Sequence, residues 1–312
     1  MFTPIVTVTL NPAIDKIIKV KNFKTEQDSR ENGISLSAGG KGVNVSRVLK
    51  NLNAKTIATG FLGGFLGLYI QKEFNKEEIK HDFLQISGQT RTNLTIIDSH
   101  QKITRVLERG PRISRRALIA FKKKFRSLLK SCRYVIFSGS IANGLPEAIY
   151  ADLITIAKQK NIKTILDTSG KPLQPGLRAR PWLVKPNREE AESVVGYKLN
   201  SSRRKKRAVK YFHKIGIETV IISFGAKGIV ASDGKEILHA DTPKLKCQNN
   251  VGCGDALVAG FVFAHQRGYG FKEAVRFSVC CAAANVRNLQ PGSIEKGWVK
   301  KLTRRVLIKK IT

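Results

Sequence analysis

One stretch of this 312-residue chain combines a glycine turn with a carboxylate: Asn250-Val251-Gly252-Cys253-Gly254-Asp255, which runs directly into an apolar segment. Two glycines around one small residue let backbone N–H groups converge at the start of a helix, where the helix dipole also attracts an anion. Phosphoryl transfer to an alcohol needs such donors and a nearby base, because charge develops on the phosphoryl group while the alcohol loses its proton. The stretch therefore suits phosphoryl transfer with Asp255 as the base; an ordinary glycine turn with an acid in the first helical turn is the alternative.

A second glycine loop, Ala38-Gly39-Gly40-Lys41-Gly42-Val43-Asn44, opens another expected helix and adds a lysine and an asparagine. This combination suits an anionic ligand rich in hydroxyl groups, with a purely structural turn as the alternative. It is not the phosphate-binding loop of P-loop proteins, because the spacing GxxxxGK[ST] is absent.

Three weaker signals follow expected strands. Asp15 comes just after the first strand, at the end where α/β sheets bind ligands. Asn187 and Glu190 lie three residues apart after Lys185-Pro186, so their oxygen atoms share a helix face and suit a hydrated Mg²⁺ ion. The tight turn from Ser223 to Gly228 leaves room for a nucleotide to approach the backbone closely.

The elements that must position these residues alternate between strand and helix. Apolar residues at helical spacing predict helices, and short β-branched runs predict strands. We expect helices over residues 42–51, 115–130, 146–159, 202–215, 254–267 and 271–288, with another starting at Asn187. We expect strands over residues 5–10, 56–60, 134–137, 164–166, 182–184 and 219–223, and hairpin-like strands over 228–231 and 236–239. Strands separated by helices of this length indicate a doubly wound α/β sheet.

Several early strands have no helix between them. The segments 17–20, 34–37, 92–98 and 103–107 read as strands, and the last two as a hairpin. We expect them to form a small β layer inserted early in the chain. No domain boundary is evident, so we expect one domain over residues 1–312.

Taken together and in this order, the motifs resemble the ribokinase-like sugar kinases, and within them the 1-phosphofructokinase and tagatose-6-phosphate kinase branch. The motifs that carry the resemblance span nearly the whole chain: TLNPAID, AGGKGVNVSRVL, the pair Thr90-Arg91, LERGP, SGSIANGLP, LDTSG, WLVKPNREE, ISFGAKG and VGCGDALVAGF. The resemblance implies a doubly wound sheet flanked by helices, with a small β-sheet lid formed by segments near 15–38 and 90–110. It also implies a homodimer paired through the lid.

The resemblance further implies a role for each matching position. Asp255 matches the catalytic base, and Gly252, Cys253 and Gly254 match the anion hole that surrounds it. The positions that match the sugar phosphate site are Asp15, Gly39, Gly40, Lys41 and Asn44, together with the lid arginines Arg91, Arg30 and Arg105. The positions that match the ATP and Mg²⁺ region are Lys185, Asn187, Glu190, Ser223, Gly225 and Gly228. Lys41 and the lid arginines favour a phosphorylated acceptor over a neutral sugar or nucleoside.

One anion-hole residue departs from the family pattern, which has alanine or serine where this chain has Cys253. Its thiol lies near a helix N-terminus, so we expect it to be more acidic than a free cysteine and to make activity sensitive to oxidants. The five cysteines show no metal-ligand spacing and are odd in number, so neither a zinc site nor a disulfide framework is indicated.

The chain is strongly basic, with 56 Lys and Arg against 23 Asp and Glu, a formal net charge of +33. The stretches 109–133, 198–214 and 296–312 carry much of this charge. Such a surface attracts anions in general. A nucleic-acid-binding protein on a kinase scaffold is therefore the non-enzyme alternative, although basic residues between apolar helical positions are usually a solvated helix face.

The acceptor that we favour is fructose 1-phosphate, which would yield fructose 1,6-bisphosphate. Tagatose 6-phosphate and fructose 6-phosphate are close alternatives. The N-terminal residues have no basic region before an apolar run, and no window approaches the roughly 20 apolar residues of a membrane span. We therefore expect a cytoplasmic enzyme without membrane contact.

Overall fold

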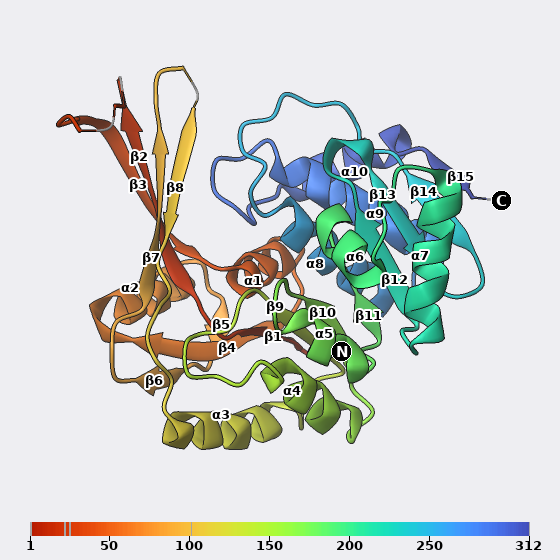
Figure 1. Cartoon of the computed structure of the whole chain (residues 1–312), viewed down its shortest axis with the longest axis horizontal. Helices are drawn as coiled ribbons and strands as arrows, with labels where there is room; N and C mark the ends of the chain where they lie inside the picture. Colours follow the sequence, from red (N-terminus) through yellow and green to blue (C-terminus); the bar gives the residue numbers. More distant parts are fainter. Residues whose placement is uncertain (1, 22, 25, 101, 312) are drawn as a thin grey trace.

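A computed structural model describes residues 2–21, 23–24, 26–100 and 102–311. Within these residues it contains an eleven-stranded sheet covered by helices and a separate four-stranded sheet that rises from the body of the molecule (Figure 1). The expected lid segments include residues 22, 25 and 101, which lie outside the described residues. The expected fold class, a helix-flanked α/β sheet with a small β lid, is confirmed.

The large sheet is parallel in its middle and antiparallel at one edge. Its order is β15 (Ile308–Lys310), β14 (Ile237–Ala240), β13 (Ile229–Ser232), β12 (Thr219–Ser223), β11 (Leu183–Val184), β10 (Lys163–Asp167), β9 (Tyr134–Ser138), β1 (Ile5–Thr9), β4 (Thr56–Gly63) and β5 (Lys80–His81), with β6 (Leu84–Ile86) also on β4. Strands β12 to β4 run parallel, so their carboxyl ends meet at one edge, where ligands bind in open α/β sheets. Strands β12 to β15 pair antiparallel.

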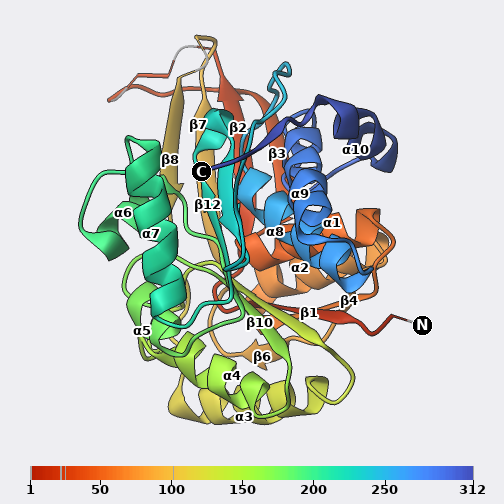
Figure 2. The same cartoon turned by 90° about the vertical axis from the view of Figure 1, so that its right-hand side faces the viewer.

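Helices cover both faces of this sheet (Figure 2). One buried cluster joins the sheet to α1 (Lys41–Asn51), α8 (Cys253–Gln266), α9 (Phe271–Asn285) and α10 (Lys296–Leu302). The cluster on the other face includes α3 (Arg115–Leu128), α4 (Ile149–Lys158), α5 (Leu173–Arg178), α6 (Arg188–Val195) and α7 (Ser202–Lys214). Two short 3-10 turns are η1 (Gly225–Lys227) and η2 (Thr303–Arg305). Among the described residues, none of the helices is both long and apolar enough to cross a membrane.

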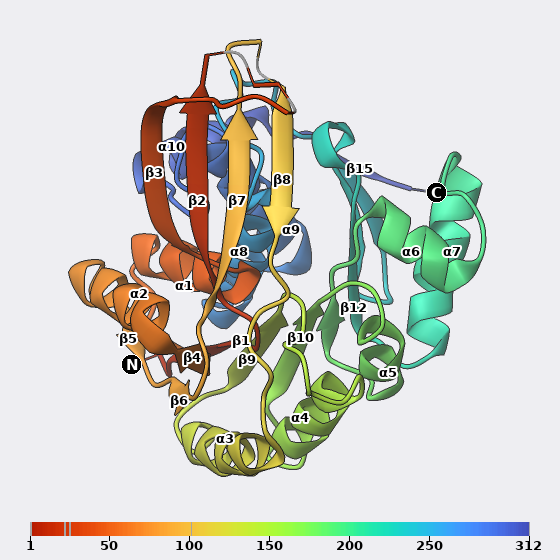
Figure 3. The same ribbon diagram turned by 60° about the vertical axis from the view of Figure 1, so that its left-hand side comes forward.

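We call the small sheet the lid. Its strands lie side by side in the order β3 (Glu31–Gly39), β2 (Ala13–Val20), β7 (Arg91–Ile97) and β8 (Ile103–Leu107) (Figure 3). Strands β7 and β8 form the expected hairpin. The root of the lid packs on α2 (Gly64–Lys76): Ile14 and Ala38 share a buried cluster with Ile70 and Phe74 of that helix. The lid is therefore anchored at its base.

The sequence did not predict α2, α5, α10 or the short strands β5, β6 and β15. Helix α2 begins at a glycine without a side-chain cap and leaves Phe65 and Leu68 exposed, so its apolar residues do not follow one face. Helix α9 ends at Asn285, three residues earlier than expected, and the side-chain amide of Asn288 donates to the Ala284 carbonyl there.

Candidate active site

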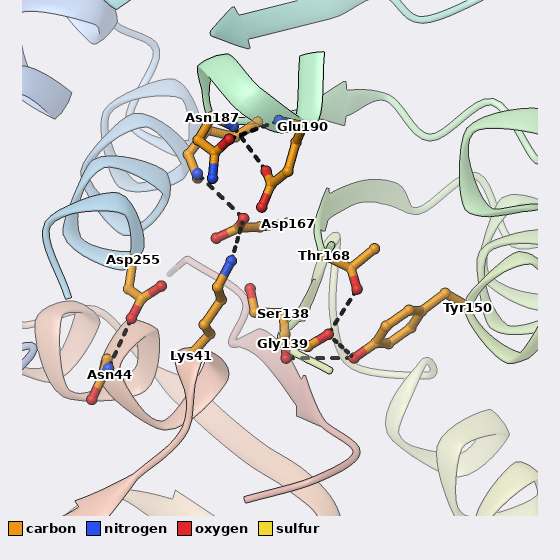
Figure 4. Close-up of polar contacts among 11 residues, drawn as sticks. Lys41, Asn44, Ser138, Gly139, Tyr150, Asp167, Thr168, Asn187, Glu190 and Asp255 are labelled. Carbon is orange, nitrogen blue, oxygen red and sulfur yellow. Dashed lines mark hydrogen bonds and ion pairs between the residues drawn. The ribbon is translucent and has the colours of Figure 1, made fainter. Parts of the chain in front are cut away.

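A buried carboxylate that the sequence did not single out lies at the centre of the site. Asp167 is the last residue of β10. The ammonium groups of Lys41 and Lys185 both contact its Oδ1 atom, at 3.1 and 3.2 Å (Figure 4). The Asp167 side chain is fully buried, and its other oxygen, Oδ2, has no hydrogen-bond partner. Burial favours the protonated form, but the ammonium groups of Lys185 and Lys41 prevail and lower the pKa of Asp167.

Asp255 lies in the first turn of α8 and is 5% exposed. Its Oδ2 accepts a hydrogen bond of 2.8 Å from the Asn44 side-chain amide on α1. Burial and the charge of Asp167 raise the pKa of Asp255 to about 6, against the opposing effects of Lys41, Asn44 and Lys185. A carboxylate with a pKa close to neutral is suited to take a proton from an alcohol in the course of a reaction.

The glycine loop before Asp255 has the conformation that the sequence predicted. Gly252 has a φ of +84° and directly precedes α8, which has no side-chain cap on its N–H groups. Asn285 holds the loop from behind, because its amide donates to the Val251 carbonyl at 2.8 Å. A Cβ atom at Gly254 would lie 3.2 Å from Nζ of Lys185, so this lysine borders the loop. Uncapped N–H groups and an ammonium group together make an anion-binding corner.

The expectation of an acidic Cys253 thiol is wrong. Burial raises the pKa of Cys253 to about 11, although the Asn285 amide contacts its sulfur at 3.5 Å. Loss of hydration outweighs the hydrogen bond from Asn285, so the thiol stays protonated near neutral pH. In the predicted anion hole, this residue would act through its backbone N–H.

Asp15 lies near two of the other predicted sugar-binding residues, Gly39 and Arg91, at the base of the lid. Asn93 on β7 donates to Asp15 Oδ1 at 2.8 Å, and a Cβ atom at Gly39 would collide with the Asp15 carboxylate. Burial raises the pKa of Asp15, while Asn93, Arg91 and Arg47 oppose that rise. Gly40 has a φ of +112° and caps α1, so the chain turns there from the lid into the helix that carries Lys41 and Asn44.

The three lid arginines are not equally placed. Arg91 donates to the carbonyls of Asn11 and Glu108, at 3.3 and 2.9 Å, at the base of the lid. Arg105 is two residues along β8 from Leu107, the position in register with Asn93, so it points to the same lid face as Asp15. Arg30 precedes β3 at the far end of the lid, roughly 20 Å of extended chain from the level of Asp15. Within one chain, Arg30 is therefore not brought to this site.

Asn187 and Glu190 are held primarily by each other. The Asn187 side chain accepts from the Glu190 backbone N–H, and Glu190 Oε2 accepts from the Asn187 N–H, both at 2.8 Å. This is a capping box at the start of α6, a structural reason for the Asn-x-x-Glu spacing. The second Glu190 oxygen is not used by the box. In the part of the chain that the structure describes, no group of three or more His, Cys, Asp or Glu side chains forms a metal cage.

The predicted nucleotide loop lies next to this cap. Ser223 ends β12, and its N–H donates to the Pro186 carbonyl at 3.0 Å. Gly225 has a φ of +60° and open space where a side chain would be, which suits a ligand. Gly228 is explained without a ligand, because a Cβ atom there would collide with the Ala240 carbonyl.

Residues that the sequence did not assign hold the loop beside Lys41. The hydroxyl groups of Tyr150 and Thr168 donate to the Gly139 carbonyl, at 3.0 and 2.8 Å (Figure 4). The Gly139 N–H donates to the Asp167 carbonyl at 3.0 Å. Gly139 and Thr168 lie in the motifs SGSIANGLP and LDTSG, whereas Tyr150 lies in none of the motifs that carry the resemblance. The signal that could have pointed to this region was Asp167, an acid that directly follows the strand expected over residues 164–166.

Comparisons with known proteins identify the family of the chain. The model of the pfkB family carbohydrate kinases matches residues 8–296. A 1-phosphofructokinase of Borreliella burgdorferi is 35% identical over 308 residues, which is 98% of this chain and 99% of that protein. A tagatose-6-phosphate kinase of Staphylococcus epidermidis is 38% identical over 259 residues, covering 82% of this chain and 83% of that protein.

Solved structures with the same fold also match. A crystal structure of phosphofructokinase-2 from Escherichia coli, in complex with potassium, superimposes with a TM-score of 0.91 at 22% identity and covers 97% of this chain and 99% of that one. At 22% sequence identity, this similarity shows a common fold and nothing further. The resemblance to sugar kinases inferred from the motifs is confirmed, and the chain belongs to the pfkB family of carbohydrate kinases.

Proposed function

We propose that the protein transfers the γ-phosphoryl group of ATP to a hydroxyl group of a ketohexose monophosphate, with fructose 1-phosphate as the favoured acceptor. The products are then ADP and fructose 1,6-bisphosphate. A 35% identical relative that covers nearly the whole chain and is named 1-phosphofructokinase supports this choice. Tagatose 6-phosphate and fructose 6-phosphate remain the alternatives, the first because of the second relative.

The observation that carries the proposal is the position of Asp255. Its carboxylate is buried at the start of α8, beside uncapped N–H groups and within the field of two lysines. The acceptor hydroxyl gives its proton to Asp255 while its oxygen bonds to the γ-phosphorus, and the bond from phosphorus to the ADP oxygen breaks. The N–H groups of residues 252–254 face the negative charge that develops on the phosphoryl group.

The positions of Lys41 and Lys185 change the roles that we assign to them. Lys41 and Lys185 converge on Asp167 rather than joining Arg91 in the lid. We therefore assign both lysines to the charge of the transferring phosphoryl group. Arg91, and Arg105 on the Asp15 face of the lid, are assigned to the phosphate that the acceptor already carries. Asp15 and Asn44 are assigned to its hydroxyl groups.

The donor set suits a Mg²⁺ ion that arrives with ATP. Asp167 Oδ2 is a buried carboxylate oxygen without a partner, and Glu190 keeps one oxygen outside the capping box. Mg²⁺ typically uses one or two carboxylates, water and substrate phosphates. Asp167 and Glu190, with Asn187 beside them, would hold the ion. Bound there, it would offset the negative charge of the phosphates.

The outer face of the lid supports a homodimer paired through the lid. The register of β3, β2, β7 and β8 puts apolar residues on the face opposite Asp15: Ile34, Leu36, Ile18, Leu94, Ile96 and Val106. Leu36 and Val106 are 46% and 55% exposed in the single chain. An apolar sheet face of this kind is stable in water only when it is covered.

Sedimentation of Val106→Glu tests the dimer. We expect the variant to sediment as a monomer and the wild type as a dimer. Leu68→Glu on α2, at a position that is also exposed, is the matched control and should leave the dimer intact. A Val106→Glu protein that stays dimeric contradicts pairing through this face.

ADP release with Mg·ATP against a panel of acceptors tests the reaction. The panel holds fructose 1-phosphate, tagatose 6-phosphate, fructose 6-phosphate, ribose and free fructose. We expect turnover on one ketohexose phosphate, and its loss in Asp255→Asn. Turnover only on a neutral sugar would keep the base but overturn the roles of Arg91 and Arg105. No turnover, together with DNA binding that weakens steeply with salt, would favour the nucleic-acid alternative.

We treat residues 1–312 as one kinase unit with its lid. A cytoplasmic location belongs to the same proposal, because ATP and sugar phosphates are cytoplasmic substrates. The basic helix α3 has an apolar side that packs on the core and a basic side that faces solvent. It buries Phe121 and Phe125, and two of its lysines pair with Asp152 and Asp82.

A further inference from the structure

Behind the proposed catalytic base lies an arginine of the motif AGGKGVNVSRVL to which neither the resemblance nor the assigned site gives a role. Arg47 is in the middle of α1, one turn after Asn44, and is 3% exposed. Its Nε atom pairs with Glu77 Oε2 at 2.7 Å, which balances the buried charge. The remaining donors of the guanidinium group point toward the active site and the base of the lid.

These donors join three segments of the chain. One terminal nitrogen, Nη1, donates to the Pro291 carbonyl at 2.8 Å and contacts Asn44 Oδ1 at 3.4 Å. The other, Nη2, donates to the Ala38 carbonyl at 3.1 Å, in the last residues of lid strand β3. The loop at Pro291 in turn lies against Gly252 of the anion hole. Arg47 therefore links the lid base, the anion hole and the partner of the base.

The contact with Asn44 determines how its amide is oriented. An amide has one accepting end and one donating end. Because Oδ1 faces the guanidinium group, Nδ2 faces Asp255, to which it donates at 2.8 Å. Turning the amide over would place its N–H groups against the guanidinium donors and its oxygen against the carboxylate. Both contacts would then be repulsive.

We propose that Arg47 is a positioning residue for the phosphoryl transfer: it holds the Asn44 amide with its donor toward Asp255, and so keeps the base ionised and in place. This inference rests on the proposed function, since it gives Asp255 the role of base. Arg47 acts through Asn44 and touches neither substrate nor the reacting atoms.

The charge of Arg47 does not account for its proposed effect on Asp255. Those groups that act on Asp255 are Asp167 from β10, Lys41 and Asn44 from α1, and Lys185 after β11. The charge of Arg47 acts instead on Asp15 in the lid. Arg47→Lys keeps this charge, and an ion pair with Glu77, but one ammonium group does not reproduce the planar set of donors. The variant therefore removes the orientation of Asn44 and leaves the charge.

A double-mutant cycle tests the proposal. The kcat and kcat/KM values for the acceptor are measured in wild type, Arg47→Lys, Asn44→Ala and the double variant. We expect Arg47→Lys to lower kcat about tenfold and to move the acidic limb of the pH profile upward. In the Asn44→Ala background the same change should cost less than about twofold, because the residue it acts through is gone.

Lys50→Met is the matched control. Lys50 lies one turn further along α1 and pairs with Glu78, the neighbour of Glu77, so it ties α1 to the same segment after α2. The two ion pairs of this lysine and of Arg47 are therefore matched in place. We expect wild-type kcat and an unchanged pH profile. If Arg47→Lys does not fold, Glu77→Gln serves in its place, because it removes the ion pair that holds the guanidinium group. We expect it to lower kcat by a smaller factor than Arg47→Lys. In the Asn44→Ala background this loss of kcat should disappear.

Two outcomes overturn the proposal. One is an equal loss of kcat from Arg47→Lys in both backgrounds. The other is a variant that loses thermal stability but keeps the wild-type kcat and pH profile. Titration of the Asp255 carboxyl carbon by NMR gives a readout without turnover: its pKa should rise in Arg47→Lys and not in Lys50→Met. An enzyme inactive on the whole panel that still shows this shift refutes the proposed function and leaves the positioning of Asp255 standing, whereas an unchanged pKa refutes the inference.

Discussion

Lys41 and Lys185 bind the same atom, Oδ1 of the buried Asp167, from two different parts of the chain. One lysine follows the lid at the start of α1, and the other follows β11. A fully buried carboxylate needs a compensating charge, and two cations on one oxygen provide more than that need. The surplus of positive charge beside the anion hole is what a phosphoryl group would meet.

The shared carboxylate predicts unequal costs for single and double substitutions. Lys41→Met leaves Lys185 on Asp167, so we expect the free energy of unfolding to fall by only about 1–2 kcal/mol. Lys41→Met/Lys185→Met strands the buried charge, and the loss should exceed the sum of the single losses by roughly 2 kcal/mol. Urea unfolding measures this. Lys171→Met, which breaks the exposed pair with Glu147, is the control with little effect. Additive losses would contradict the shared role.

The pKa of Asp255, about 6, predicts the acidic limb of the pH profile. The base works only when ionised, so kcat/KM should be level above this pH and fall about tenfold per unit below it. Asn44→Ala removes a hydrogen bond that lowers the pKa, so the limb should move upward. The acceptor phosphate also titrates in this range but identically in both proteins. A limb that stays in place in Asn44→Ala would rule out Asp255 as its source.

The same raised pKa predicts a gain of stability when the base is removed. In the unfolded chain Asp255 has the ordinary aspartate pKa of 3.8, whereas in the folded protein its pKa is about 6. Ionised Asp255 therefore destabilises the folded state, fully above about pH 6 and not at low pH, where the group is protonated in both states. Asp255→Asn should therefore raise the free energy of unfolding near neutral pH, by up to about 3 kcal/mol. The gain should shrink as the pH falls toward about 4. Calorimetry at the two pH values checks this, and a lower melting temperature of the variant at neutral pH would count against it.

The raised pKa of the half-buried Cys253 thiol predicts an enzyme that resists oxidation at this residue. With a pKa of about 11, the thiolate is a minor species at neutral pH, and oxidation by peroxide proceeds through the thiolate. Turnover should survive brief treatment with millimolar peroxide, while the exposed Cys247 is alkylated readily. Cys253→Ala should keep kcat within about threefold, because the anion hole uses backbone donors. A loss of activity that Cys253→Ala prevents would restore the redox role.

The main alternation of strands and helices was predictable from the sequence because hydrophobic periodicity reports local structure. The lid hairpin, the first strand and α8 lie close to where their patterns place them. Helix α2 was not predictable, since its exposed Phe65 and Leu68 hide the buried face. The short strands β5 and β15 form only because a neighbouring strand offers its edge, which is not a local property.

For the active site, the sequence by itself determined which groups are present: the glycine loops, Asp255, and the lysines and arginines for an anionic substrate. The tertiary structure decided what each group faces. Lys41 turns to Asp167, Asn187 and Glu190 cap a helix, and Arg30 lies apart from Asp15. Burial raises the pKa of Asp255 and also that of Cys253, against the expectation of an acidic thiol. Hydration and electrostatic fields depend on residues distant in the chain, so spacing alone cannot supply them.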